Sequence, residues 1–307
     1  MKFHFLKGLG ALLLTALTTF DASAAAGYAT CSIKNLGSAT AVYSMLTTGK
    51  TSRQVTFDVY CERLTDTGGQ TTTTVNYAVA ANNGVQPSPI TQNRAKFGAA
   101  NFLNYDLYTD ASCNTLWSGI PSLATSLLSG NSFTHPYSVY MCINAGLSVA
   151  DGTYADSVNL TLSGSTSGSG SGSVQFSVGL PNPSILAVSI ITPPTCTLAS
   201  TLNNVNFETY TAFGGALAKT VQMNATCTST FPYTMSIAAA NNYGVIAGLN
   251  YSLSFSDTSI TNSIPVVGTG FLQGTPLYAK MASGQAGTCG TGTCTATSSA
   301  ITLTITY

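Results

Sequence analysis

Charged side chains are scarce in this sequence. Among its 307 residues only 10 are Lys or Arg and 10 are Asp or Glu, so the formal net charge is zero. Nucleic acids and acidic membrane surfaces attract proteins through concentrated positive charge, which this chain does not offer. We therefore expect no nucleic-acid partner. Thr, Ser, Gly and Ala dominate instead, a composition typical of exported structural proteins built from strands and turns.

Side chains that could perform catalysis or bind a metal ion are also few. The chain has 2 histidines; His4 lies near the N-terminus, and His135 stands in a polar stretch. No Ser-His-Asp spacing and no paired C-x-x-C motifs accompany them. We expect no enzymatic activity and no cofactor, and we expect His135 to lie in a surface loop. The few acidic residues fit strand ends and turns, with a glycosidase pair as the alternative.

Long apolar runs are absent except near the N-terminus. Two lysines there precede a short apolar run, 12–17, and Ala22-Ser23-Ala24 fits the small-x-small rule for signal-peptide cleavage. The run is too short to span a bilayer, which argues against the alternative of a membrane anchor. We therefore expect residues 1–24 to be a signal peptide and the mature chain to be exported.

The chain has 8 cysteines, all of them in the part expected to be exported. An even number in an exported chain predicts that all are disulfide-bonded. Zinc is the competing interpretation, but the shortage of histidine argues against it. The similar separation of the first two cysteines in each half of the chain favours pairing within each half, and elimination leaves the other pairs. The expected disulfides are Cys31–Cys61, Cys113–Cys142, Cys196–Cys227 and Cys289–Cys294.

Two copies of one sequence plan run along the chain. Matched blocks occur in the same order in both copies, and each block is short, alternating and rich in Thr, Val, Ile and Tyr. This alternation predicts β-strands separated by turns, and no window beyond the signal peptide shows sustained helical spacing. We therefore expect an all-β protein with two immunoglobulin-like sandwiches in tandem. The matched blocks are 75–85 with 233–245, 103–110 with 249–257, 136–141 with 276–281, and 153–164 with 298–307.

The boundary between the two domains is predicted from the proline and glycine residues that interrupt the strand-like runs. The Gly/Ser-rich segment 165–173 could serve as a linker, but a strand-like run follows it before Pro181-Asn182-Pro183 interrupts the sequence. We therefore expect a first domain over 25–180 and a second over 181–307. The run before the prolines should close the first sandwich, and the run Ile185–Ile191 should open the second. The closing side chains would be Val174, Phe176, Val178 and Leu180.

The last strand-like run of the sequence has one apolar and one polar face. Its apolar residues alternate with threonines, and no closing strand follows them in this sequence. A sandwich that lacks its closing strand exposes an apolar groove and an unpaired edge, which accept a strand from another chain. A complete, smaller sandwich is the alternative. The expected groove residues are Ile301, Leu303, Ile305 and Tyr307.

The first copy resembles the spore coat protein U domain, which is the pilin fold of archaic (Csu-type) chaperone–usher pili. The resemblance rests on LNYDLYTD at 103–110, on Trp117, and on the Gly-x-Tyr-x-Asp pattern that begins at Gly152. The second copy keeps LNYSLSFSD at 249–257 and the final ITLTITY, but it lacks the Trp and the Gly-x-Tyr-x-Asp pattern. The resemblance therefore implies the same fold for both copies, with different loops in the second.

The resemblance also implies a mechanism of assembly. Pilins of this family are incomplete sandwiches: a periplasmic pilus chaperone lends a strand, and an outer-membrane usher exchanges it for the N-terminal extension of an adjacent subunit. Two-domain members are tip adhesins. Cleavage after Ala24 would leave few residues before Cys31, too few for a donor strand. We therefore expect this subunit to accept a strand, to cap a pilus at the cell surface, and to promote attachment and biofilm formation.

The segment 111–134 is rich in apolar residues, although its turn residues are typical of a loop. Strand counting places it at the pole far from domain two, beside 62–73 and 165–173. Apolar residues in a loop need either a core or a binding partner. We expect them to bind a surface; the alternative is that they pack onto their own sandwich, above all Ile120. A glycan-binding tip and a purely structural coat or filament subunit are the other functional alternatives. The residues expected to bind an abiotic or host surface are Ile120, Leu123, Leu127 and Leu128.

Overall fold

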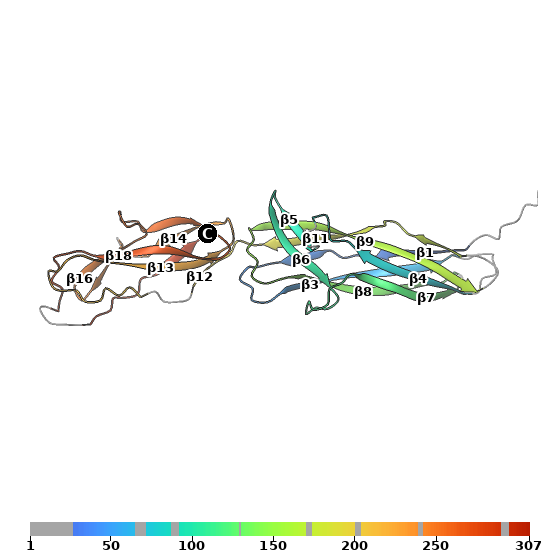
Figure 1. Cartoon of the computed structure of the whole chain (residues 1–307), viewed down its shortest axis with the longest axis horizontal. Coiled ribbons are helices and arrows are strands. Elements are labelled where there is room, and N and C mark those ends of the chain that lie inside the picture. Colours follow the sequence, from blue (N-terminus) through green and yellow to red (C-terminus); the bar gives the residue numbers. More distant parts are fainter. Residues whose placement is uncertain are drawn as a thin grey trace, which may run out of the picture.

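The protein is all-β, as its sequence predicts. The computed structural model describes residues 27–64, 72–86, 92–128, 130–169, 174–199, 204–238, 242–289 and 295–307. Within these ranges the regular elements are strands, and they form two sandwiches placed end to end (Figure 1). This part of the chain has no helix long and apolar enough to cross a membrane. The expected signal peptide lies outside the described residues.

The first sandwich contains eleven of the strands. Their bounds are β1 (Gly27–Lys34), β2 (Ala39–Val42), β3 (Thr51–Arg63), β4 (Thr72–Ala81), β5 (Asn93–Phe97), β6 (Asn101–Tyr108), β7 (Gly119–Leu128), β8 (Ser132–Ile143), β9 (Gly152–Ser169), β10 (Val174–Val178) and β11 (Ser184–Thr192). One layer has the order β10-β1-β3-β8-β6, and the other joins β7, β4, β9, β11 and β2. Strand β5 pairs with β6 and touches β9, so it connects the two layers. Alternate side chains of both layers fill one core between them.

The strand β11 belongs to the first sandwich. It pairs antiparallel with β9 and parallel with β2, so it lies between them. Its inward side chains, Leu186, Val188 and Ile190, are at most 2% exposed and sit in the first core. The expectation that Ile185–Ile191 opens the second domain is therefore wrong, and the first domain extends to Thr192. The burial of its three alternate apolar side chains decides which sandwich the strand joins. The proline turn that precedes the strand does not decide it.

The strand β10 lies at the opposite edge of the sandwich, parallel to β1. Phe176 and Val178 pack half-buried against the first core, whereas Leu180 is 85% exposed. The run 174–180 was expected to close the first sandwich alone. In the structure two strands share this role: β10 covers the edge beside β1, and β11 fills the slot beside β9. Asn182 anchors the turn between them, because its side chain hydrogen-bonds both the N–H and the C=O of Leu162 at 3.0 and 3.1 Å. The side chain of Val174 lies outside the described residues.

The second sandwich repeats the strand order of the first. Its strands are β12 (Cys196–Leu198), β13 (Leu217–Cys227), β14 (Pro232–Ile237), β15 (Tyr243–Ile246), β16 (Leu249–Ser254), β17 (Ser263–Val267), β18 (Leu272–Met281) and β19 (Leu303–Thr306). The order β12-β13-β18-β16-β15 matches β1-β3-β8-β6-β5, and β17-β14-β19 matches β7-β4-β9. The matched sequence blocks therefore correspond to strands at equivalent places in the two domains.

The disulfides tie equivalent strands in the two domains. Cys31–Cys61 joins directly opposite positions of β1 and β3, and Cys196–Cys227 does the same for β12 and β13. Cys113–Cys142 fastens the turn after β6 to β8. Cys289 is also disulfide-bonded, but its expected partner, Cys294, lies outside the described residues.

Candidate strand-acceptor groove and adhesive pole

The strand β19 occupies in the second sandwich the place that β9 has in the first. Ile237 of β14 lies opposite Leu303, just as Val79 of β4 lies opposite Leu162 of β9. In the first sandwich the far edge of β9 is covered by β11. Among the described residues of the second sandwich, no strand pairs with the far edge of β19. The two copies thus differ at the slot beside this strand, which β11 fills in the first sandwich.

The side chains beside this slot are less buried in the second sandwich than their equivalents in the first. Ile301, Leu303 and Ile305 are only half-buried against the second core, whereas the threonines between them are exposed. The corresponding residues of β9 are almost completely buried, with Leu160 at 0% and Leu162 at 2% exposed. Loss of a covering strand would produce this pattern. The predicted groove residues are therefore brought together, except for the terminal tyrosine.

Tyr307 lies at the margin of this row of side chains. It is 61% exposed, and its ring meets Phe231 edge-on with 6.2 Å between the ring centroids. The opposite rim of the slot corresponds to β2 of the first sandwich. In the segment between β12 and β13, Val205 is half-buried and Phe207 is 9% exposed, and both pack on the second core.

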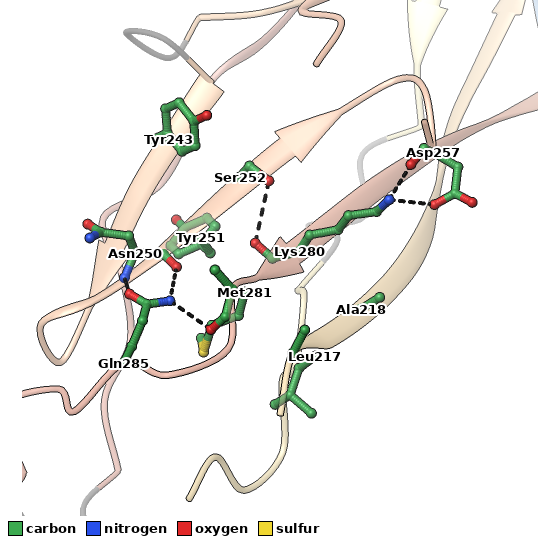
Figure 2. A pocket seen from close by; sticks show the side chains of 12 residues that line it. Leu217, Ala218, Tyr243, Asn250, Tyr251, Ser252, Asp257, Lys280, Met281 and Gln285 are labelled. Carbon is green, nitrogen blue, oxygen red and sulfur yellow. Dashed lines mark hydrogen bonds and ion pairs between the residues drawn. The ribbon is translucent and has the colours of Figure 1, made fainter. Parts of the chain in front are cut away.

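A separate hollow of about 750 Å³ lies on the second sandwich, along β13, β16 and β18 (Figure 2). Its polar side chains are engaged with one another and with the backbone. Lys280 Nζ is 2.8 Å from Asp257 Oδ1. Gln285 donates its Nε2 to the C=O of Asn250 at 2.9 Å and accepts the N–H of Asn250 at 2.7 Å (Figure 2). The hollow contains none of the predicted groove residues, and its polar contacts stabilise the loop after β18.

The distal pole of the first sandwich is formed by the ends of several strands. Thr72, at the start of β4, lies opposite both Leu128 of β7 and Ser169 of β9, and Glu62 of β3 lies opposite Ser132 of β8. These ends gather away from the second sandwich, where β4 and β7 run out (Figure 1). The expected positions of 62–73 and 165–173 agree with this arrangement. Of 111–134, only the end of β7 and the turn before β8 lie at this pole, because Cys113 is fastened to Cys142 near the other end of β8. Parts of these loops, 65–71, 129 and 170–173, lie outside the described residues.

The predicted adhesive leucines lie on a strand, β7, and not in a loop. Leu127 is 3% exposed and sits in the first core, so the expectation that its side chain is presented to a surface is wrong. Ile120 is half-buried against the same core, as the alternative interpretation proposed for it. Leu123 lies opposite Tyr77, on the same face of β7 as Leu127, but it is 40% exposed at the edge of the sandwich. The side chain of Leu128 lies outside the described residues.

The motif residues of the first copy hold loops in place. Tyr105 donates its hydroxyl to Asp156 Oδ2 at 2.7 Å in a buried position, and burial raises the pKa of Tyr105. The other carboxylate oxygen accepts the N–H of Val85 at 3.0 Å. Asp110 accepts the N–H of Thr115 at 2.9 Å, and backbone N–H groups lower the pKa of this carboxyl. These acids therefore have structural partners, as expected for turns and strand ends.

His135 lies on β8 and not in the expected surface loop. Its ring is half-buried, and Nδ1 is 2.6 Å from the hydroxyl of Tyr77, which also contacts the hydroxyl of Tyr137 at 2.6 Å. Burial raises the pKa of Tyr77. The histidine is positioned by aromatic neighbours, with Phe133 4.8 Å away between centroids. Within the described ranges, no group of three or more His, Cys, Asp or Glu is placed to hold a metal ion.

Comparison with known families gives one match, in the first domain. Residues 16–161 match the family described as the Spore Coat Protein U domain. This part of the chain is similar to spore coat protein U domains. The match ends within β9, so β10, β11 and the second sandwich lie beyond the matched residues of the spore coat protein U domain. No curated protein matches the chain significantly.

Solved structures of pilus proteins are similar to the whole chain at low identity. One is the CsuC–CsuE chaperone–tip adhesion subunit pre-assembly complex of archaic chaperone–usher Csu pili from Acinetobacter baumannii. It is 16% identical, with 90% of this chain and 100% of that chain covered and a TM-score of 0.45. Another is the CupB6 tip adhesin of Pseudomonas aeruginosa, 12% identical, with 90% of this chain and 94% of that chain covered and a TM-score of 0.34.

Proposed function

We propose that this chain is a non-enzymatic tip adhesin subunit of an archaic chaperone–usher pilus. The observation that carries the proposal is the difference between the two sandwiches. β11 completes the first, whereas the slot beside β19 has no strand among the described residues of the second. The spore coat protein U match of the first domain supports the same assignment. The chain would be exported through the periplasm and act at the pilus tip on the cell surface.

The groove of the second domain would receive a strand twice. A periplasmic chaperone would fill it first, and an outer-membrane usher would replace that strand with one from an adjacent pilin subunit. Ile301, Leu303 and Ile305 would be covered by the apolar side chains of the incoming strand. Covering a large aliphatic side chain contributes roughly 1.5–3 kcal/mol when its full area is removed from water, and half-buried side chains gain part of that. The free edge of β19 would add backbone hydrogen bonds.

Adhesion would use the distal half of the first domain. Leu123 on β7 and Leu64 just after β3 are 40% and 52% exposed, and both belong to the part of the sandwich farthest from the groove. The sparsely charged composition of the chain favours contact with apolar abiotic or host surfaces, and attachment and biofilm formation would follow. A glycan-binding tip is the second candidate function, favoured by a cavity beside Trp117.

The test compares two neighbouring substitutions in the full chain, coexpressed with an archaic-pilus chaperone and usher. Leu303→Asp places a charge in the groove, whereas Thr304→Asp places the same charge on the exposed side of β19. We expect the first to abolish recovery of the chaperone complex and display at the pilus tip, because a buried unpaired carboxylate opposes strand insertion. The second should be recovered and displayed. Normal display of Leu303→Asp would contradict the proposal.

A further inference from the structure

The strand β19 is shorter than its equivalent in the first sandwich. It has 4 residues, whereas β9 has 18. Leu303 of β19 corresponds to Leu162 of β9, because the two lie opposite equivalent residues of β14 and β4. The part of β9 that pairs with β11, 152–160, therefore corresponds to 293–301, of which the structure describes 295–301. The slot that β11 fills in the first sandwich thus lies beside residues that precede β19 in the second.

Residues 295–300 belong to no strand and are exposed. The equivalent stretch of β9 is paired with β11, and its Ala155 lies opposite Lys96 of β5. Tyr154 and Val158 of this stretch are 0% exposed. In the described part of the second sandwich, β15, the equivalent of β5, pairs only with β16. The segment therefore lacks the strands that hold and cover its equivalent in the first sandwich.

One side-chain contact shows that the segment already lies near the path of a strand, but out of register with it. Tyr251 is the equivalent of Tyr105, whose hydroxyl donates to Asp156. By the register of β14 with β19, the equivalent of Asp156 is Thr297. Tyr251 donates its hydroxyl instead to Ser298 Oγ at 2.9 Å. Neighbouring residues of a strand face opposite sides, so Thr297 would face Tyr251 only after the segment had paired regularly.

We propose, building on the strand-acceptor function above, that residues 295–301 are the edge to which the donated strand binds and that they extend β19 when it binds. The donated strand would run antiparallel to this edge, with one residue opposite Ile301 as Ser184 lies opposite Leu160. Ordering an exposed segment costs conformational entropy, and the burial of apolar side chains from the incoming strand offsets that cost.

The same edge defines the chemistry of the partner strand. The inward residues of the ordered segment would all be small and polar: Thr295, Thr297 and Ser299. Their equivalents in β9, two of them larger and apolar, are Tyr154, Asp156 and Val158. The segment therefore contributes little apolar surface of its own, and the partner must supply it. A strand with three large apolar side chains at alternate positions fits this requirement, as β11 does in the first sandwich.

Hydrogen exchange of the full chain, followed by mass spectrometry, measures this ordering directly. The probe is a synthetic peptide with the sequence of β11, Ser184–Thr192, extended by lysines for solubility. The control peptide carries Asp at the three inward positions. Calorimetry reports binding as a rise in the transition of the second domain. We expect the amides of 295–301 to exchange about tenfold more slowly or less with the probe peptide, and as in the free chain with the control peptide.

The outcome separates this register from the acceptor function itself. A raised second transition with protection confined to 303–306, or with no protection of 295–301, would mean that the second domain accepts a strand in another register and would overturn the proposal. No rise and no protection with the probe peptide would contradict both the register and the acceptor function.

Two substitutions test the register independently. Ser299 and Thr302 are both exposed in the free chain, so an Asp at either position is compatible with its fold. Ser299→Asp would place a carboxylate beneath the donated strand, where the equivalent Val158 is buried, whereas Thr302 corresponds to the exposed Thr161. We expect Ser299→Asp to weaken peptide binding about tenfold or more, measured by fluorescence anisotropy, and Thr302→Asp to bind like the unchanged chain. Equal affinity of the two variants would refute the register.

Discussion

At the scale of single residues, the family motif owes its form to one buried contact. The hydroxyl of Tyr105 and the carboxylate of Asp156 meet across the two layers, and the carboxylate also holds the N–H of Val85. Gly84 leaves room for this carboxylate, because a Cβ at its position would lie 2.0 Å from Asp156 Oδ2. The Tyr and the Asp of the pattern thus fix the loop after β4 onto β9.

Tyr105→Phe should lower the free energy of unfolding of the first domain by about 1.5–3 kcal/mol, because a buried carboxylate loses a hydrogen bond. Urea denaturation followed by circular dichroism measures the change. Tyr108→Phe is the matched control, since Tyr108 lies on the outer side of β6, where Lys50 Nζ is 5.4 Å from its ring centroid. An equal loss in both variants would mean that the Asp156 contact contributes nothing specific.

Leu123 and Leu127 of one strand should separate adhesion from stability. Leu127→Ala should cost about 2–5 kcal/mol, because it empties a buried site. Leu123→Ser should cost less than Leu127→Ala, about 1–2 kcal/mol, since only part of its side chain is removed from water. Attachment of cells that carry the pilus to hydrophobic plastic should fall with Leu123→Ser. Full attachment by that variant would remove Leu123 from the binding surface.

At the scale of elements, the sequence predicts the strands better than their partners. Alternation revealed the strands of the matched blocks and also β10 and β11, because one face of each lies on a core. β7 was missed because Pro121 interrupts it; the register of β4 and β7 shifts between Tyr77 and Val79, opposite this proline, and β7 pairs only with β4. An edge strand tolerates a proline at a bulge, which alternation does not reveal.

The partner of β11 was missed for a different reason. Its apolar face is clear in the sequence. A strand that lies between the two copies in sequence can pack in either sandwich, and no local sequence rule tells which of the two cores covers it. By contrast, the half-buried row of Ile301, Leu303 and Ile305 was predictable from alternation. The cavity beside Trp117 was not, because its side chains come from segments whose proximity depends on the whole strand order.

Neighbouring residues of β11 should respond differently to a charge. Leu186→Asp should unfold the first domain or destabilise it by more than about 4 kcal/mol, because the carboxylate would enter the core. Ile185→Asp should be tolerated, since that side chain is 62% exposed. Thermal melts of the full chain, with the first-domain transition followed by Trp117 fluorescence, compare the two. Similar melting of both variants would contradict the assignment of β11 as the closing strand.

At the scale of the whole molecule, the two sandwiches are joined by a few direct contacts. The N–H of Ser229 donates to the C=O of Val149 at 3.1 Å, and Ser148 Oγ donates to the C=O of Thr269 at 3.1 Å. These contacts connect the near end of the first sandwich to the turn regions of the second. In the proposed adhesin, the first domain, which β11 completes, would bind the surface. The second domain, which has no described strand beside β19, would join the pilus.

The first domain should fold independently only when β11 is included. A fragment of residues 25–192 should be monomeric and unfold in one cooperative transition, because its core is covered on both edges. A fragment that ends at 180 lacks the strand between β9 and β2, and it should aggregate or melt without a cooperative transition. Size-exclusion chromatography and calorimetry compare them. A well-folded shorter fragment would show that β11 is dispensable.

The central claim is that the second domain accepts a strand beside β19, and supplying one tests it most directly. The sequence of β11, Ser184–Thr192, would be appended after Tyr307 through a flexible Gly/Ser linker, and calorimetry would measure the transition of the second domain. The control carries Asp in place of the three core-facing residues of the appended copy, those equivalent to Leu186, Val188 and Ile190. We expect the appended strand to raise the second transition well above that of the unchanged chain and of the control. A second transition that is the same in all three proteins would contradict the claim.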